Sequence, residues 1–293
     1  LHSFPTRRSS DLFTKTPAQI LVEQAGKKGQ LDHLLRRFAG LSTHYPPSEA
    51  IIVRFANSDS ELRDRAYKCI LGILLESEQF RVRTLDDAVR TLNDARLVRD
   101  TITLLITDQL YGIVFEGSGY LRYEMVKFAA GMGYALEAMA NFTNLSKEQC
   151  FLVGVTSTLG IPVLASAQES KYGSVLGQLP GSSVRLEDAE TASFGLNHLA
   201  ISAAISQIYE FPDWVQRALD PNVIPGPIQK GLELSRRILL FQRIDRGLST
   251  IAPALTEKDL DLVGLTPELL ESLVDSVLHG VSTFQQVVYS DQE

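Results

Sequence analysis

Hydrophobic side chains recur every three or four residues along most of the chain, which is the spacing of an amphipathic helix. Residues 61–76 show this pattern clearly, since Leu62, Ala66 and Cys69 fall on one face. The same spacing predicts further helices over residues 17–40, 48–55, 84–92, 97–106, 120–142, 186–209 and 228–246, with weak breaks at 26–29 and near Gly195. The alternation of polar and apolar residues that is typical of strands between hairpin turns is not found. The sequence therefore predicts an all-α protein without a substantial β-sheet.

Local signals predict where several helices begin and end. Ser146 and Gln149 have the spacing of a capping box, which starts a helix. Gly40 is expected to end the first long segment, and the two prolines within residues 42–47 predict a turn. Residues 173–183, rich in glycine and serine, are predicted to form a loop. Because the linkers are too short for an obvious second domain, we expect a single multi-helix bundle.

An uncharged run covers residues 149–168, and Ser157 and Thr158 stand at its centre. Its length is about that of a membrane-spanning helix. The run also contains Pro162, two glycines and several hydroxyl side chains, so it is not strongly hydrophobic. The pattern favours a buried central helix followed by a break, rather than a membrane span.

The formal net charge of -7 argues against nonspecific binding to nucleic acid or to an anionic membrane. The short basic clusters at residues 36–37 and 236–237 lie among apolar residues at helical spacing, and we interpret them as solvated helix faces. Cys69 and Cys150 are far apart in sequence and lie in apolar contexts. Two buried thiols of this kind imply no disulfide framework and fit a reduced, cytoplasmic setting.

Residues 1–12, LHSFPTRRSSDL, lack the apolar segment of a secretory signal. They resemble the translation of a sequencing-adapter fragment. We therefore expect them to be foreign to the protein, and the predicted fold begins after them.

The common catalytic motifs are missing from the sequence. Gly154 and Gly160 flank a short segment that lacks the lysine of a phosphate-binding loop, and Ser157 does not lie in a GxSxG turn. None of the five histidines has a second histidine at ligand spacing on the same helix. His198 is interpreted as a structural hydrogen-bonding residue, and the acidic residues within 187–190 as a first helical turn that the helix dipole favours. The residues by themselves thus predict no catalytic group, no metal and no cofactor.

Residues 151–164, FLVGVTSTLGIPVL, resemble the central helix of the HDOD family, the HD-related output domains. The family pattern there is Phe-Leu-x-Gly-Leu-Leu-His-Asp-Ile-Gly-Lys. The matching residues are Phe151, Leu152, Gly154 and Gly160, and in a second block Glu190, Phe194, Gly195, His198, Pro212 and Ala218. Residues 34–47, 84–102 and 263–273 are similar to three further segments of the family. The resemblance implies an all-α bundle of the HD-superfamily type, with residues 30–280 as the HDOD-like domain, 13–29 as an N-terminal helix or linker, and 281–293 as a polar tail.

The chain departs from the family where a metal-binding HD protein has its ligands. The position of the family's His is Ser157, that of its Asp is Thr158, and that of its Lys is Ile161. The early His position corresponds to Tyr123, and the later His-rich step to residues 220–222. Only His198 remains, and one imidazole with two hydroxyls cannot hold a catalytic divalent metal without other donors. The resemblance therefore implies a domain that has lost its metal site.

We expect a non-catalytic regulatory module of bacterial signal transduction that acts through contacts with other signalling proteins, and that binds neither nucleic acid nor membrane. One alternative is a divergent, metal-dependent HD-type phosphohydrolase with a different ligand set. Another is a sensor that binds a small anion or nucleotide in a vestigial pocket near Tyr123, Ser157, Thr158, Asn197 and His198. The sequence leaves the oligomeric state open.

Overall fold

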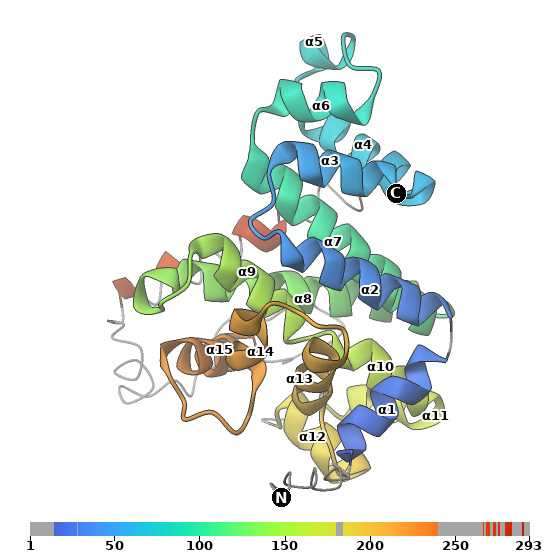
Figure 1. The fold of residues 1–293 in the computed structure, drawn as a ribbon, viewed down its shortest axis with the longest axis vertical. Coiled ribbons are helices and arrows are strands. Elements are labelled where there is room, and N and C mark those ends of the chain that lie inside the picture. Colours follow the sequence, from blue (N-terminus) through green and yellow to red (C-terminus); the bar gives the residue numbers. More distant parts are fainter. Residues whose placement is uncertain are drawn as a thin grey trace, which may run out of the picture.

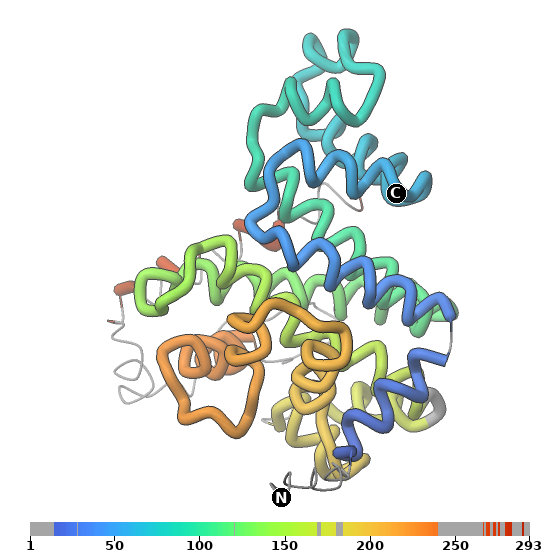
Figure 2. Tube along the Cα trace, in the orientation of Figure 1, coloured from blue at the N-terminus to red at the C-terminus, as the bar shows by residue number. Residues whose placement is uncertain are grey.

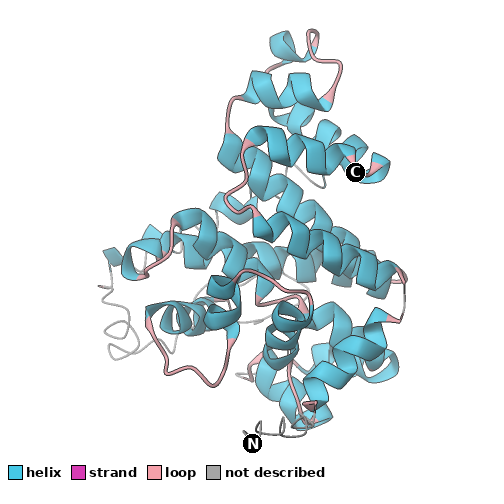
Figure 3. Cartoon of the chain, in the orientation of Figure 1, coloured by secondary structure: helices cyan, strands magenta, loops and turns pink. Residues whose placement is uncertain are grey.

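The computed structural model describes residues 15–27, 29–179 and 184–239, together with 266, 268, 269, 272, 273, 275, 279–282 and 289. In this part of the chain all regular structure is helical, which confirms the predicted all-α class (Figures 1 and 3). The elements are α1 (Pro17–Gly26), α2 (Gln30–Thr43), α3 (Glu49–Asn57), α4 (Ser60–Ile73), α5 (Glu76–Gln79), α6 (Leu85–Leu92), α7 (Ala95–Val114), α8 (Gly119–Ala138), η1 (Ala140–Phe142), α9 (Lys147–Thr156), α10 (Gly160–Ala167), α11 (Glu169–Gln178), α12 (Leu186–Phe194), α13 (His198–Ile208), α14 (Asp213–Leu219) and α15 (Pro227–Ile238). Residues 1–12, for which we expect a foreign origin, lie outside the described residues, as does the end of the helix predicted over 228–246.

The long helix α7 links two groups of helices. Helices α3 to α6 gather around its first half, at the top of Figure 1, and α5 projects furthest from the rest. Below them α8 and α9 pack against each other as a hairpin, and α10 to α15 continue the lower group. The N-terminal helix α1 contacts α13 and α10, so the blue start of the chain lies beside its green and yellow segments in Figure 2.

Side-chain caps begin the helices where the sequence indicates. The capping box is complete at α9: the Gln149 backbone N–H donates to Ser146 Oγ at 3.2 Å, and the Ser146 N–H donates to Gln149 Oε1 at 3.0 Å. The interruption near Gly195 is also confirmed, because Gly195 has a φ of 75° and ends α12. The chain then restarts as α13.

Two limits predicted at glycines are wrong, and the helix predicted over 120–142 ends as α8 at Ala138, followed by the 3₁₀ helix η1. Residues 173–178, expected in a loop, belong to α11, because Tyr172, Val175 and Leu176 recur at helical spacing and are buried. Burying such side chains outweighs the roughly 1 kcal/mol that each glycine costs in a helix. Helix α2 likewise continues past Gly40 to Thr43, since Leu41 beyond the glycine is buried.

The uncharged run forms α9 and α10, and it is buried as predicted for a central helix. Lys147–Ala167 is long and apolar enough to cross a membrane, but 89% of its apolar window is buried by the rest of the fold. The backbone breaks at residues 157–159, which precede Pro162. Pro162 lies in the first turn of α10, where its missing N–H removes no helical hydrogen bond.

Candidate functional site

The junction between α9 and α10 holds the two polar residues at the centre of the run. Ser157 and Thr158 are buried, with exposed fractions of 1% and 0%. The Ser157 Oγ donates to the Gly154 carbonyl at 2.6 Å, and the Thr158 Oγ1 donates to the Val155 carbonyl at 2.8 Å. Each hydroxyl thus has a backbone acceptor in its own turn and is satisfied without a ligand.

Helix α13 packs directly on this junction. The Ser202 Oγ donates to the Ser157 carbonyl and accepts from the Gly160 N–H, both at 2.8 Å. A Cβ atom at Gly160 would lie 2.0 Å from the His198 carbonyl oxygen. Only a glycine therefore allows the start of α13 to approach the start of α10 this closely.

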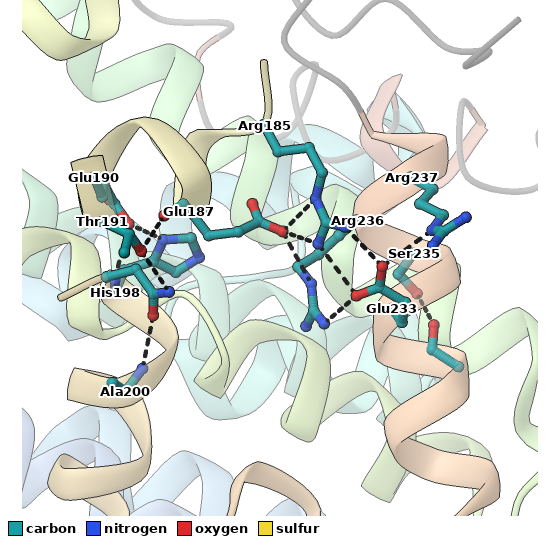
Figure 4. A network of polar contacts seen from close by, with 12 residues as sticks. Arg185, Glu187, Glu190, Thr191, His198, Ala200, Glu233, Ser235, Arg236 and Arg237 are labelled. Atoms are coloured by element: carbon teal, nitrogen blue, oxygen red, sulfur yellow. Dashed lines mark hydrogen bonds and ion pairs between the residues drawn. The ribbon is translucent and has the colours of Figure 1, made fainter. Parts of the chain in front are cut away.

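His198, the first residue of α13, is held by a carboxylate (Figure 4). Its Nδ1 lies 2.6 Å from Glu190 Oε2, which also accepts from the His198 backbone N–H at 2.8 Å. The Tyr172 hydroxyl donates to Glu190 Oε1 at 2.5 Å. Burial and the charge of Glu190 hold the pKa of Tyr172 well above its ordinary value, so the phenol stays protonated as a donor. Glu190 therefore ties α11, α12 and α13 together. The sequence interpretation of residues 187–190 as a dipole-favoured first turn missed this role.

The other two residues of the predicted pocket have different surroundings. Asn197 caps α13: its Oδ1 accepts from the Ala200 N–H, and its Nδ2 donates to Thr191 Oγ1, both at 3.1 Å. Tyr123 lies on α8, where its ring centroid is 4.9 Å from that of Tyr289. The structure thus brings together Ser157, Thr158 and the start of α13, while the ring of Tyr123 makes an edge-to-face contact with Tyr289.

A pocket of about 410 Å³ opens beside the junction, and Ser157 is part of its lining. The remaining walls come from Leu199 on α13, the end of α14, the loop that follows it, and α15. Asp220 and Pro221, which the resemblance matched to the later His-rich step, line the same pocket. The sequence interpretation missed the contribution of α15, although Leu232 and the charged residues of that helix have helical spacing.

The charges along one side of this pocket form a closed network (Figure 4). Glu233 accepts from Arg185 at 2.7 Å, from Arg236 at 2.7 Å and from Arg237 at 3.0 Å. Burial alone would raise the pKa of Glu233, but the hydrogen bond from Arg185 and the charge of Arg236 outweigh it and lower the pKa to about 2. The carboxylate is therefore ionised and fully engaged.

The interpretation of the two basic clusters as solvated faces is wrong for one residue of each. The side chains of Arg36 and Arg237 are 70% and 36% exposed, but those of Arg37 and Arg236 are only 10% and 14% exposed. Arg37 pairs with Asp59 and Arg236 with Glu233. For Arg236 a signal was present in the sequence, because Glu233 precedes it by three residues and so lies on the same helical face.

A divalent metal of the HD type does not fit the residues at this junction. In the described ranges, no group of three or more His, Cys, Asp or Glu side chains converges as metal ligands would. The imidazole and carboxylate beside the junction, His198 and Glu190, bond to each other. The hydroxyls of Ser157 and Thr158 bond to backbone carbonyls. Hard divalent ions need several oxygen or nitrogen ligands at once, and this arrangement does not supply them.

The fold and the junction define a helical bundle built around a buried, broken central helix. Residues 77–221 match the family model of the HDOD domain, so the chain carries an HDOD domain. A search of curated proteins finds no match.

Three solved structures share this fold. A "Putative signal transduction protein" from Marinobacter aquaeolei VT8 has a TM-score of 0.64 and 17% identity over 94% of this chain, which spans 66% of that protein. An HDOD domain protein of unknown function from Geobacter sulfurreducens has a TM-score of 0.59 and 15% identity, covering 92% of this chain and 98% of that one. A "Putative phosphohydrolase" from Shewanella amazonensis SB2B has a TM-score of 0.57 and 14% identity, covering 93% and 98%. At these identities the similarity establishes the fold and leaves the activity to be argued from the site.

Proposed function

We propose that this protein is a non-catalytic module of signal transduction that acts by binding other signalling proteins. The observation that carries the proposal is the bonding of Ser157 and Thr158, whose hydroxyls both donate to backbone carbonyls of their own turn. Hydrolysis of the HD type needs a metal-bound water as nucleophile. The residues at the junction offer no ligand set for that metal, so the chemical step has no nucleophile there.

Two exposed apolar side chains support a role in protein contacts. Leu75 and Phe80 flank α5, the element that projects furthest in Figure 1, and their exposed fractions are 68% and 88%. Large apolar side chains that stay in water at a projecting tip are typical of binding surfaces, since a partner gains free energy by covering them. The tip lies in the group of helices around the first half of α7, on the other side of that helix from the α9–α10 junction.

The absence of catalysis is tested by metal analysis and by hydrolysis. The purified protein is assayed for bound metal and for turnover of a panel of phosphoesters with added Mn²⁺ or Mg²⁺. We expect substoichiometric metal and no turnover above the buffer rate. Stoichiometric metal together with turnover would establish the phosphohydrolase instead. In that case His198→Gln abolishes the turnover, and its melting temperature shows that the variant is still folded.

The interaction surface is tested at the tip formed by α5 and its flanking residues Leu75 and Phe80. A partner captured from cells is purified and titrated against the wild type, the double variant Leu75→Ser/Phe80→Ser, and Ile20→Ser. Ile20 is a matched control because it is also apolar and 44% exposed, but lies on α1. The double variant is expected to weaken binding at least about tenfold, since buried aromatic anchors carry much of an interface's affinity. Equal affinity of the wild type and the double variant contradicts a role for the tip.

A further inference from the structure

The pocket beside Ser157 combines a largely apolar wall with one available cation. Its walls include Leu199, Ala218, Leu219, Val223 and Leu232, contributed by three helices and the loop after α14. The volume of about 410 Å³ falls within the range of roughly 300–1,000 Å³ that is usual for small-molecule sites. A pocket with these apolar walls favours an organic ligand with an apolar body over a highly charged ligand.

Most polar groups of the lining already have partners. Asp220 Oδ1 accepts from the backbone N–H of Asn222 at 2.9 Å and from its side chain at 3.1 Å. Gln229 accepts from the Gly226 N–H at 3.0 Å and donates to the Arg217 carbonyl at 2.9 Å. These contacts fix the loop and the start of α15 and leave little capacity for a ligand.

Of the remaining charged groups of the lining, two have ion-pair partners in the described part of the chain and one does not. Glu233 and Arg236 bond to each other at 2.7 Å, within the network described above. Lys230, half-buried on α15, has no ion pair or side-chain hydrogen bond among the residues that the structure describes. Arg236 Nε makes no hydrogen bond among these residues, but it lies 3.4 Å from Glu187, within the network. Lys230 is therefore the lining cation that no described carboxylate pairs with, and an ammonium beside an apolar wall attracts one negative charge.

We propose that this pocket binds a small amphipathic organic anion, with its carboxylate on Lys230 and its apolar body against Leu199, Val223 and Leu232. The geometry disfavours a nucleotide, because the lining's two cations, Lys230 and Arg236, are matched by the carboxylates of Asp220 and Glu233, and Arg236 already pairs with Glu233, so several phosphate charges would find one cation that no described carboxylate pairs with. Of the ligands expected for a vestigial pocket, the proposal keeps the small anion and leaves out the nucleotide; it also places the ligand away from Tyr123 and Asn197, which are not among the lining residues. The proposal does not depend on the proposed function: a regulatory module and an enzyme could both use such a site.

The test compares acids with their neutral amides. Octanoate and 4-phenylbutyrate, and octanamide and 4-phenylbutanamide, are titrated into the full chain by calorimetry and by thermal shift, with ATP as a polyanionic comparison. A ligand that binds only the native state raises the melting temperature. We expect both acids to bind more tightly than their amides and ATP not to bind. No saturable binding of either acid up to about 5 mM, or tighter binding of ATP, overturns the proposal.

Variants then locate the site. Lys230→Met keeps an unbranched side chain, one atom shorter, and removes its charge, and it is expected to weaken acid binding about tenfold while leaving the amides unchanged. Val223→Glu, at a position 40% exposed, places a carboxylate on the wall and is expected to abolish acid binding. Lys171→Met, on the exposed side of α11, is the matched control and is expected to bind like the wild type. Unchanged acid binding in both Lys230→Met and Val223→Glu, with helical circular dichroism like the wild type, refutes the assignment.

Discussion

In two buried regions of this molecule, polar side chains find their hydrogen-bond and ion-pair partners in opposite ways. At the α9–α10 junction, Ser157 and Thr158 bond to backbone carbonyls one turn away. Between α7 and α8, three ionisable side chains are buried instead: Arg99 is 4% exposed, Asp100 2% and Glu137 3%. The junction thus holds neutral groups with local partners, whereas the α7–α8 cluster holds charges that depend on other helices.

The partners of the charged cluster come from several elements. Arg99 donates to Asp100 Oδ1 through Nε at 2.9 Å and through Nη2 at 2.8 Å, and it also lies 3.8 Å from Glu148 at the start of α9. Glu137 accepts from Arg96 at 2.8 Å through Oε2, but its Oε1 has no hydrogen-bond partner among the described residues. The difference teaches that the α9–α10 junction is held by neutral hydrogen bonds within its own turn, whereas the α7–α8 cluster is held by ion pairs that also reach α9.

The largest expected effect comes from removing the buried guanidinium of the α7–α8 cluster. Arg99→Met leaves Asp100 buried without the guanidinium that donates to it twice and takes a nearby positive charge away from Glu137, and breaking a buried pair in this way costs about 3–5 kcal/mol. Arg63→Met is the control, because Arg63 pairs with Asp64 at the surface, with side chains 45% and 63% exposed, and such pairs contribute at most about 1 kcal/mol. Urea unfolding of both variants measures the two costs. Equal costs would show that the cluster is no more than a surface network.

A smaller loss is expected where α8 and α9 touch. A Cβ at Gly154 would lie 2.3 Å from the Met132 carbonyl oxygen, so Gly154→Ala must separate the two helices and is expected to destabilise the fold by about 1–3 kcal/mol. Gly72→Ala, on α4, meets nothing within 4 Å and should stabilise by up to about 1 kcal/mol. Thermal unfolding of the two variants should therefore shift in opposite directions. A stable Gly154→Ala would mean that the hairpin is loosely packed.

The charged cluster should also make stability depend on pH. Burial raises the pKa of Asp100 from 3.8 to about 7, with Arg99 opposing and Glu137 adding to the shift. Between about pH 4 and 7 the folded state therefore holds a proton that the unfolded state has lost, and stability falls as the pH rises. Relative to Asp100→Asn, the wild type should lose up to about 1.4 kcal/mol per pH unit in this window. A constant difference in unfolding free energy between the two proteins from pH 4 to 7 would contradict the raised pKa.

The smallest effect is expected at the junction itself. Thr158→Val keeps the shape of the side chain and removes a hydroxyl whose acceptor lies three residues back. The Val155 carbonyl that loses this donor keeps its helical geometry, so the unfolding free energy should change by no more than about 1 kcal/mol, without pH dependence. Chemical unfolding at pH 5 and pH 8 provides the measurement. A loss as large as that of Arg99→Met would show that Thr158 is part of an organised polar site.

Much of the local structure could be predicted from the sequence. The capping box of Ser146 and Gln149, the break at Gly195 and the periodic apolar faces depend on neighbours within a few residues, and the structure confirms them. The loop predicted over residues 173–183 was wrong for its first half, because the helix there is held by burying Tyr172 and Leu176 against distant elements. Likewise, the interpretation of the acidic residues within 187–190 used only the helix dipole. It could not foresee that Glu190 accepts from Tyr172 and His198.

The sequence by itself determined the helical class and placed Ser157, Thr158 and His198 at the positions of the HDOD central helix and its following block. The helical class followed because helix periodicity and caps are encoded over short stretches of chain, whereas the placement came from the resemblance of residues 151–164 and 190–218 to the family. Tertiary structure alone decided that the two hydroxyls are turned to their own backbone, that Tyr123 meets Tyr289 edge to face, and that α15 brings Lys230 to a pocket beside Ser157. These outcomes depend on how helices distant in sequence pack together, and on which buried charges find partners there, and neither is set by the spacing of residues along the chain.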